Sequence, residues 1–174
     1  MLEVSAFKLE FCDGVIYAMA GGTVAHAAIG AAAIRLVGQA LEGMCSVFTS
    51  DLKIRIDATD LTTFPDLSIV CGPVETSTRD PHAVTNPTAL VEVTSRSTED
   101  YDRGDKLSHY KQLPSLRAVL FLSHREARVT VVERATGGDW VEHDVRAGET
   151  VKLASPQLGL SVDALYTGIS LEPK

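Results

Sequence analysis

The sequence predicts an α/β sandwich in which helices flank a central mixed β-sheet. Between Thr23 and Met44, apolar residues recur at three- and four-residue spacing, which is typical of an amphipathic helix. The run Thr88–Thr94 is short, apolar and rich in β-branched residues, which is typical of a central strand. Other strand-like runs lie on both sides of it, with a second helical segment between them. This order favours a mixed sheet with helices on its faces.

The composition is that of one ordinary globular domain. The chain has 174 residues, of which 45% are hydrophobic and 22% are charged, so we expect a single domain over residues 1–174. The longest apolar stretch, residues 25–41, is interrupted by glycine and polar residues and is shorter than the roughly 20 apolar residues that span a bilayer. The start of the chain lacks the pattern of a secretory signal, so we expect a cytoplasmic protein that does not bind membranes.

The three cysteines predict no special chemistry. Cys12, Cys45 and Cys71 are an odd number and show neither a CxxC motif nor the spacing of a zinc site. We therefore expect free, buried thiols rather than a disulfide or a structural metal.

The first predicted helix covers Thr23–Met44. Thr23 suits an N-cap, and Gly43 stands near the end, where helices often stop. The many alanine and glycine residues indicate close packing, because each interior glycine costs about 1 kcal/mol relative to alanine. The apolar stripe that should pack on the sheet is Ile29, Ala33, Leu36, Ala40 and Met44.

Three strands should follow this helix. The segment Val47–Ile56 alternates between apolar and polar residues, which predicts one strand with one buried face. After the polar residues 57–63, a second strand should open just after Pro65, where a proline is tolerated because the first residue of a strand need not donate a hydrogen bond. The third strand is Thr88–Thr94. Between the second and third strands, residues 72–87 read as a long loop.

The rest of the chain predicts a second helix and additional C-terminal strands. Residues 95–113 begin with serine, threonine and acidic residues, which the positive end of a helix dipole favours, and end before Pro114. The turn sequence TGGD separates the last two of the predicted strands. These later elements are strands at residues 118–123, 128–134 and 140–145 and a short helix near residues 163–166.

Two carboxylates stand out in this arrangement. Glu92 lies in the middle of the central strand, where an ionised group is rarely left unless it is paired or binds a metal. Asp66 is likewise a carboxylate at a position that we expect to be buried, at the start of the preceding strand. If the two strands are neighbours, both carboxylates can reach one cation, which predicts a magnesium site completed by waters and a substrate phosphate.

A lysine in the second helix could complete this site. Asp102, Lys106 and Tyr110 recur every four residues and so share one helix face. If that face covers the carboxylates, Lys106 can point at the attacking water or the phosphate. The alternative is an ordinary surface pair between Asp102 and Lys106, worth about 0.3 to 0.5 kcal/mol.

The ordered motifs FPDLSIV, LVEVTSRST and YDRGDKLSHY, followed by LPSL and an apolar strand, resemble the Uma-two family of restriction endonuclease-like proteins. This family is a branch of the PD-(D/E)XK nuclease superfamily. The opening LEFCDGVIYAMAGGTVAHAAI also resembles the family, in which a glutamate and an Asp-Gly turn precede a hairpin and a helix that contains a histidine. The resemblance covers about residues 9–166 and implies a restriction-endonuclease-like fold.

The resemblance also implies a site. Asp66, Glu92 and the backbone carbonyl of Val93 would bind Mg2+ or Mn2+, Lys106 would supply the lysine, and Glu10 would match the N-terminal acid of the family. The standard lysine of the superfamily stands two residues after the second acid, a place taken here by Thr94. The implied activity is metal-dependent hydrolysis of phosphodiester bonds, with DNA favoured over RNA as the nucleic-acid partner. His26 could contact a phosphate or could be a buried, hydrogen-bonded histidine.

A net charge of −7 excludes a strongly basic surface, so phosphate contacts would need a local basic patch. Its candidates are Lys53, Arg55, Arg96, Arg103, Lys106 and Lys111. Two alternatives to the nuclease stay open. One is a catalytically silent nucleic-acid-binding or assembly domain, and the other is a metal-dependent hydrolase of small phosphorylated molecules. By analogy with other sandwiches that have exposed strand edges, we expect a homodimer.

Overall fold

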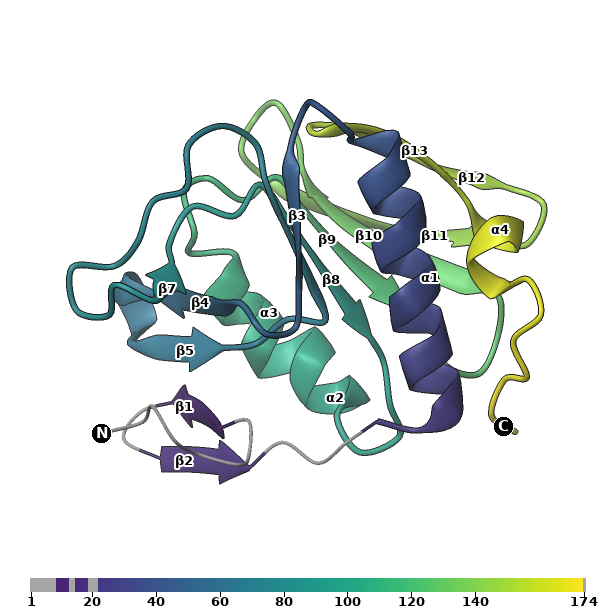
Figure 1. Ribbon diagram of the computed structural model, residues 1–174, viewed down its shortest axis with the longest axis horizontal. Coiled ribbons are helices and arrows are strands. Elements are labelled where there is room, and N and C mark those ends of the chain that lie inside the picture. Colours follow the sequence, from purple (N-terminus) through teal and green to yellow (C-terminus); the bar gives the residue numbers. More distant parts are fainter. Residues whose placement is uncertain (1–8, 13–14, 19–21, 174) are drawn as a thin grey trace.

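The computed structural model describes residues 9–12, 15–18 and 22–173, and describes side chains from residue 22 onward. Its centre is a six-stranded mixed sheet with the strand order β11-β10-β9-β8-β6-β3 (Figure 1). Only β8 and β9 run parallel; the other neighbours are antiparallel. The predicted α/β fold with a central mixed sheet is therefore confirmed. The six strands are β3 (Ser46–Thr49), β6 (Leu67–Val70), β8 (Ala89–Val93), β9 (Ala118–Leu122), β10 (Arg128–Arg134) and β11 (Trp140–Arg146).

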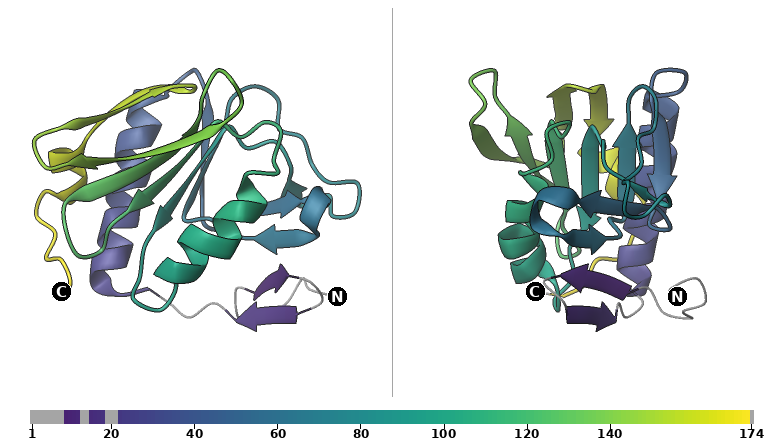
Figure 2. Two further views of the ribbon diagram at one scale, coloured as in Figure 1. Left: turned by 180° about the vertical axis from the view of Figure 1, so that it is seen from behind. Right: turned by 90° about the vertical axis from the view of Figure 1, so that its left-hand side faces the viewer.

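Helices cover both faces of this sheet. Helix α1 (Val24–Ala40) lies on one face, and a segment formed by α2 (Glu99–Tyr101), the π-helical turn η2 (Asp102–Lys106) and α3 (Leu107–Tyr110) lies on the other (Figures 1 and 2). The alternation along β8 explains this arrangement, because successive side chains of a strand point to opposite faces. Val91 and Val93 pack in the same core as α1, whereas Leu90 packs in the core of α3.

Smaller elements complete the two faces. A second sheet with the order β2-β1-β5-β4-β7 contributes apolar side chains to the core of α3. The hairpin of β12 (Thr150–Ala154) and β13 (Gln157–Ser161) packs with α4 (Val162–Tyr166) in the core of α1. The strands of the second sheet are β1 (Leu9–Cys12), β2 (Val15–Ala18), β4 (Lys53–Ile56), β5 (Leu61–Thr63) and β7 (Ala83–Val84).

The start of α1 was predicted closely, whereas the helix ends at Ala40 and not at the predicted Met44. Thr23 is its N-cap, because its hydroxyl accepts a hydrogen bond from the backbone N–H of His26 at 3.2 Å. The same hydroxyl donates to Glu172, so the C-terminal segment returns to the start of α1. The helix ends three residues before Gly43, which has a left-handed φ of 74°.

The prediction of a single strand over Val47–Ile56 was wrong. Strand β3 ends at Thr49, where the backbone N–H of Leu52 donates to the Thr49 carbonyl at 3.1 Å and closes a turn. After this turn, β4 joins the second sheet. The apolar alternation was read correctly, since Phe48 and Ile54 face the same core. The alternation of apolar and polar residues continues across the turn, so the sequence pattern does not reveal the change of sheet.

Other boundaries also differ from the prediction. The polar residues 57–63 contain the 3-10 turn η1 (Asp57–Thr59) and β5, whose Leu61 is fully buried. The second helix starts at Glu99 rather than at residue 95 and contains a π-helical turn. The hairpin β12–β13 was not identified individually, although its buried and exposed residues alternate regularly.

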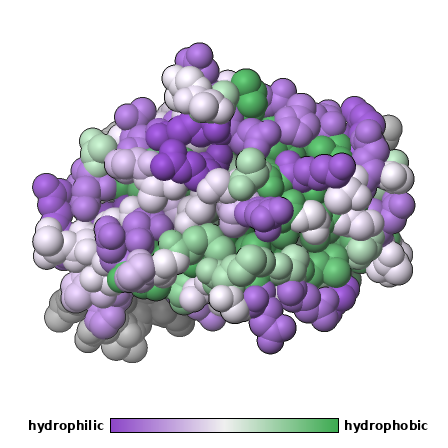
Figure 3. Space-filling view, turned by 90° about the horizontal axis from the view of Figure 1, so that it is seen from above, coloured by the Kyte–Doolittle hydropathy of each residue, from purple (hydrophilic) through white to green (hydrophobic). Residues whose placement is uncertain are grey.

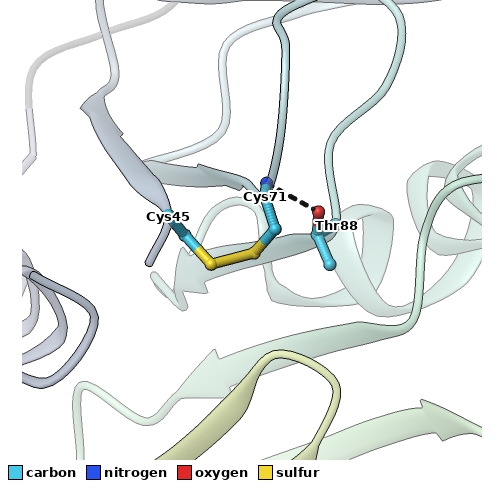
Figure 4. Close-up of a disulfide and its surroundings, with 3 residues drawn as sticks. All are labelled: Cys45, Cys71 and Thr88. Atoms are coloured by element: carbon cyan, nitrogen blue, oxygen red, sulfur yellow. Dashed lines mark hydrogen bonds between the residues drawn. A yellow bond between two sulfur atoms is a disulfide. The ribbon is translucent and has the colours of Figure 1, made fainter. Parts of the chain in front are cut away.

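The prediction of free thiols was wrong for two of the three cysteines. Cys45 and Cys71 form a disulfide, and the Cys71 N–H donates to the Thr88 hydroxyl at 3.0 Å (Figure 4). Cys45 immediately precedes β3 and Cys71 immediately follows β6, and these antiparallel strands pair Ser46 with Val70. The two cysteines are therefore opposite each other across the strands, although 26 positions separate them. The Cys12 side chain lies outside the described residues.

In the view from above, hydrophilic and apolar residues gather on different parts of the surface (Figure 3). Hydrophilic residues cover most of its upper part, and a band of apolar residues crosses the lower half (Figure 3). Within the described residues, no helix combines the length and the apolar character needed to cross a bilayer.

Candidate active site

The two predicted carboxylates lie together at the end of the central strands. Strands β6 and β8 pair Leu67 with Val91, and continuing this antiparallel register by one residue places Asp66 opposite Glu92. Residues opposite each other in an antiparallel pair point to the same face. The Val93 N–H also donates to Asp66 Oδ2 at 2.7 Å, which fixes the Asp66 carboxylate against the end of β8.

Glu92 is held by two side chains from the helical segment behind it. Lys106 Nζ lies 2.9 Å from Glu92 Oε1, and the Tyr110 hydroxyl donates to the same oxygen at 2.5 Å. All three side chains are buried, with residue exposures of 3% for Glu92, 2% for Lys106 and 0% for Tyr110. Because both of these donors use Oε1, the second carboxylate oxygen is the one that the described side chains leave for a further ligand.

Asp102 belongs to the same buried group. Its Oδ1 lies 3.4 Å from Lys106 Nζ, and both side chains are almost inaccessible to solvent. The alternative of an ordinary surface pair is therefore wrong. Both residues belong to η2, and π-helical turns are rare and often occur at functional sites. This turn follows the loop after β8 and places Asp102 and Lys106 against Glu92.

The environment of Glu92 raises the pKa of its carboxyl group to about 8 from an ordinary value of 4.5. Burial is the main cause, because removal from water disfavours the ionised form. The charge of Lys106 opposes this effect, whereas the nearby charges of Asp66 and Asp102 add to it. Lys106 alone therefore does not compensate the negative charge that this site would carry when all its carboxylates are ionised.

His26 links α1 to the carboxylates. Its Nε2 lies 3.4 Å from Asp66 Oδ2, and the ring is about one-fifth exposed. The hydrogen bond with Asp66 is the largest cause that raises the pKa of His26, while burial opposes it. The structure thus places this histidine beside a candidate metal ligand. The sequence had left open whether His26 contacts a phosphate or only a protein group.

The remaining predicted residues are less closely defined. Glu10 lies in β1, but its side chain is outside the described residues. Several candidates for a basic patch are paired with carboxylates: Lys53 with Asp80 at 2.7 Å, Arg55 with Asp57 at 2.8 Å and Arg103 with Glu142 at 2.7 Å. Arg96 is exposed in the loop after β8, and Lys111 lies over the ring of Trp140.

The residues at this site fit a hard divalent cation. The described side chains contain no group of three or more histidine, cysteine or acidic residues placed to hold a metal. Mg2+ is usually bound by only one or two carboxylates, with waters and phosphate oxygens as the other ligands. Asp66, Glu92 and the Val93 carbonyl match that pattern. The charge of a bound cation would also offset the burial that raises the Glu92 pKa.

Comparisons with known proteins identify the family of this chain and a solved structure with the same fold. A family model, Uma2, described as "Putative restriction endonuclease", matches residues 2–165. An uncharacterised protein from Synechocystis sp. is 36% identical over 164 residues, which cover 94% of this chain and 85% of that protein. A second uncharacterised protein from the same organism is 25% identical over 140 residues, or 80% of this chain and 79% of the relative. A crystal structure from Anabaena variabilis, described as "a putative nuclease belonging to DUF820", has a TM-score of 0.79. It covers 97% of this chain and 95% of its own at 15% identity, and so shows a shared fold.

Proposed function

Because this chain belongs to the Uma2 family of restriction endonuclease-like proteins, we propose that it is a divalent-metal-dependent nuclease that hydrolyses phosphodiester bonds in DNA. The family and the nuclease-like fold support a nuclease. The metal, the preference for DNA and the residues named below are our proposal. We further propose that the chain acts as one domain.

Asp66, Glu92 and the Val93 carbonyl would hold a Mg2+ or Mn2+ ion. When bound, such an ion polarises the phosphoryl oxygens and lowers the pKa of a coordinated water. The protein supplies the geometry. The Val93 N–H orients Asp66, while Tyr110 and Lys106 fix one oxygen of Glu92. Side chains locked by such partners keep a site close to its productive geometry.

Lys106 would act on the attacking water and on the charge that develops at phosphorus. Its ammonium lies between Glu92 and Asp102, so it is held in place by two carboxylates. The attacking water loses a proton as its oxygen bonds to phosphorus, the bond from phosphorus to the leaving oxygen breaks, and the leaving oxygen takes up a proton, so that one water is divided between the two products. A fixed cation next to this centre stabilises the added negative charge without needing to reorganise. The reaction requires no covalent enzyme intermediate.

One observation carries this proposal: two carboxylates face each other at the ends of neighbouring central strands, with a buried lysine 2.9 Å from one of them. The test is a substrate panel with Mg2+ or Mn2+ that comprises supercoiled plasmid, single-stranded DNA, RNA and a small phosphorylated molecule. We expect cutting of plasmid that stops with a chelator. Hydrolysis of the small molecule alone would instead favour the hydrolase of small phosphorylated compounds.

The silent binding or assembly domain is supported by a different observation. Three of the candidate phosphate contacts, Lys53, Arg55 and Arg103, have their charge offset by acidic partners, and the net charge is −7. Calorimetric titration with Mn2+ separates this alternative from the nuclease. A nuclease site should give saturable binding that Asp66→Asn and Glu92→Gln abolish, whereas a silent domain would give no heat of binding with the wild type.

A further inference from the structure

The ends of β8 and β9 hold a second buried polar group, which the proposed mechanism does not use. Thr94 directly follows β8 and is 2% exposed, and His124 follows β9 and is 1% exposed. Thr94 Oγ1 lies 2.8 Å from His124 Nδ1, and Arg125 Nε donates to His124 Nε2 at 3.0 Å. Buried polar side chains are nearly always hydrogen-bonded. The role of each atom can therefore be worked out.

Arg125 decides which nitrogen of His124 carries the proton. A guanidinium group is always protonated and can only donate. His124 Nε2 therefore accepts from Arg125 at 3.0 Å, while Glu172 Oε2, at 3.9 Å from the same nitrogen, lies beyond hydrogen-bond distance. In the neutral ring the proton is then on Nδ1. The Nδ1–H group donates to Thr94 Oγ1. The opposite tautomer would place two N–H groups against each other along the contact between Arg125 and His124.

The Thr94 hydroxyl oxygen therefore accepts two hydrogen bonds. It accepts from Nδ1–H, and the backbone N–H of His124 also donates to it at 3.4 Å. A hydroxyl has two acceptor positions and one proton to donate. Among the residues that the structure describes, the two nitrogens of His124 are the hydrogen-bond partners of this hydroxyl, and neither can accept its proton. Within that part of the chain the proton has no acceptor, which leaves it for a ligand.

The position of Thr94 indicates what that group is. Thr94 lies one residue beyond β8 but extends its ladder, because the Thr94 N–H donates to the Leu122 carbonyl at 2.9 Å. Residues two apart on a strand share a face and lie about 7 Å apart along it, so Thr94 and Glu92 point to the same side. Thr94 also directly follows Val93, whose N–H binds Asp66. A ligand that meets this hydroxyl therefore sits beside the two carboxylates. It must be an acceptor, because both acceptor positions of the hydroxyl are occupied.

We propose that Thr94 binds a nonbridging oxygen of the scissile phosphate, and that His124 and Arg125 are positioning residues that act through it. This inference rests on the proposed nuclease function and adds a substrate contact to it. A phosphate oxygen only accepts hydrogen bonds and so matches a hydroxyl that can only donate. Thr94 forms no covalent bond in the reaction and keeps its proton.

The test measures binding of a fluorescent DNA duplex in Ca2+, together with cleavage in Mg2+. Thr94→Val removes the hydroxyl at nearly constant shape, and Thr94→Ser keeps it. The matched control is Thr88→Val, because Thr88 stands at the other end of the same strand and its hydroxyl accepts from the backbone N–H of Cys71. We expect Thr94→Val to weaken DNA binding by about tenfold or more, as for a lost hydrogen bond to a charged acceptor. Thr94→Ser and Thr88→Val should bind like the wild type.

The outcomes separate this inference from the proposed function. If the wild type cleaves DNA but Thr94→Val binds and cleaves like Thr88→Val, the Thr94 contact is wrong and the nuclease stands. If nothing cleaves but Thr94→Val alone loses DNA binding, Thr94 contacts a DNA phosphate, but the nuclease is wrong and that phosphate is not a scissile one. If the wild type binds no DNA, both are overturned.

A double-mutant cycle tests the role of His124. His124→Gln places its amide near the position of Nε2 and removes the donor at Nδ1. If His124 acts through Thr94, the double variant Thr94→Val/His124→Gln should bind DNA no more weakly than Thr94→Val alone. If His124 has a purely structural role, the loss of DNA affinity in the double variant should be the product of the losses in the two single variants. Nitrogen NMR of the wild-type ring should find the proton on Nδ1, and a proton on Nε2 would contradict the assignment.

Discussion

At the scale of single residues, the charge of Glu92 governs the behaviour of the site. A carboxyl group buried in a central strand is costly to ionise, and Lys106 and Tyr110 reduce that cost without removing it. The ionised form of Glu92 is therefore unfavourable in the folded protein, and a bound cation would stabilise it. Side chains with strongly shifted pKa values occur often at functional sites.

This gives a prediction for the stability of the protein without metal. The folded protein holds a proton on Glu92 up to a pKa of about 8, whereas the unfolded chain releases it near 4.5. A group whose pKa is raised by folding contributes its stability at low pH and loses it as the pH rises through the folded value. In chelator, the melting temperature should therefore fall between about pH 5 and about pH 8. Glu92→Gln should show a weaker dependence, and equal pH profiles for the two proteins would contradict the account.

Tyr110 provides a second prediction at this scale. Tyr110→Phe removes the hydrogen bond to Glu92 Oε1 and leaves the packing of the ring unchanged. Partners that orient a metal ligand typically contribute about tenfold or more to metal affinity. We expect Mn2+ binding, measured by calorimetry, to weaken by about tenfold. Tyr166→Phe is the matched control, because the buried Tyr166 hydroxyl shares its proton between the backbone carbonyls of Ser123 and Arg128 and not with a proposed metal ligand. Equal affinities for both variants would exclude this role for Tyr110.

At the scale of elements, the sequence predicted a helix or strand correctly where the spacing of its apolar residues stays regular from end to end. The apolar periodicity over Thr23–Met44 and the apolar run Thr88–Thr94 predicted α1 and β8. The predicted stripe of α1 was right only at its start: Ile29 and Ala33 are buried, whereas Ala40 and Met44 are exposed. The buried face continues through Val37 and Leu41 instead.

The pairing of Asp66 and Glu92 followed from the assumption that their strands are neighbours. The contact between Tyr110 and Glu92 could not be predicted, because it depends on how a π-helical turn rotates one helical segment against the sheet. Likewise, the change of sheet after Thr49 depends on tertiary packing.

The disulfide between β3 and β6 gives a prediction for these elements. A cross-link that closes a loop of this size stabilises a protein by about 2 to 4 kcal/mol, mainly by restricting the unfolded chain. Reductant should therefore lower the free energy of unfolding of the wild type by that amount, as measured by urea denaturation. The variant Cys45→Ser/Cys71→Ser should have this lower free energy of unfolding both with and without reductant. A wild type that is insensitive to reductant would instead support free thiols.

At the scale of the whole molecule, the two edges of the main sheet bear on assembly. Strands β3 and β11 form these edges, and β11 is a seven-residue strand on which Val141 is 45% exposed. Exposed edges of this kind are commonly covered by another strand. We therefore expect a homodimer that buries β11.

Light scattering with size-exclusion chromatography tests this expectation. The wild type should have twice the mass of the chain, and Val141→Lys should shift it to the monomer. Val74→Lys is the matched control, because Val74 is equally exposed but lies in the loop after β6. A monomeric wild type would refute the homodimer and leave the proposed active site unaffected.

The central claim is that Asp66 and Glu92 form the metal site of a nuclease. The measurement that tests it most directly is cleavage of supercoiled plasmid by chelator-treated protein, before and after Mg2+ or Mn2+ is added back. We predict that the wild type cuts only after metal addition, and that Asp66→Asn and Glu92→Gln each lower the rate by about a hundredfold or more. Asp80→Asn, which removes a carboxylate paired with Lys53 instead, should cut like the wild type. Cutting without metal, or equal cutting by all four proteins, would contradict the claim.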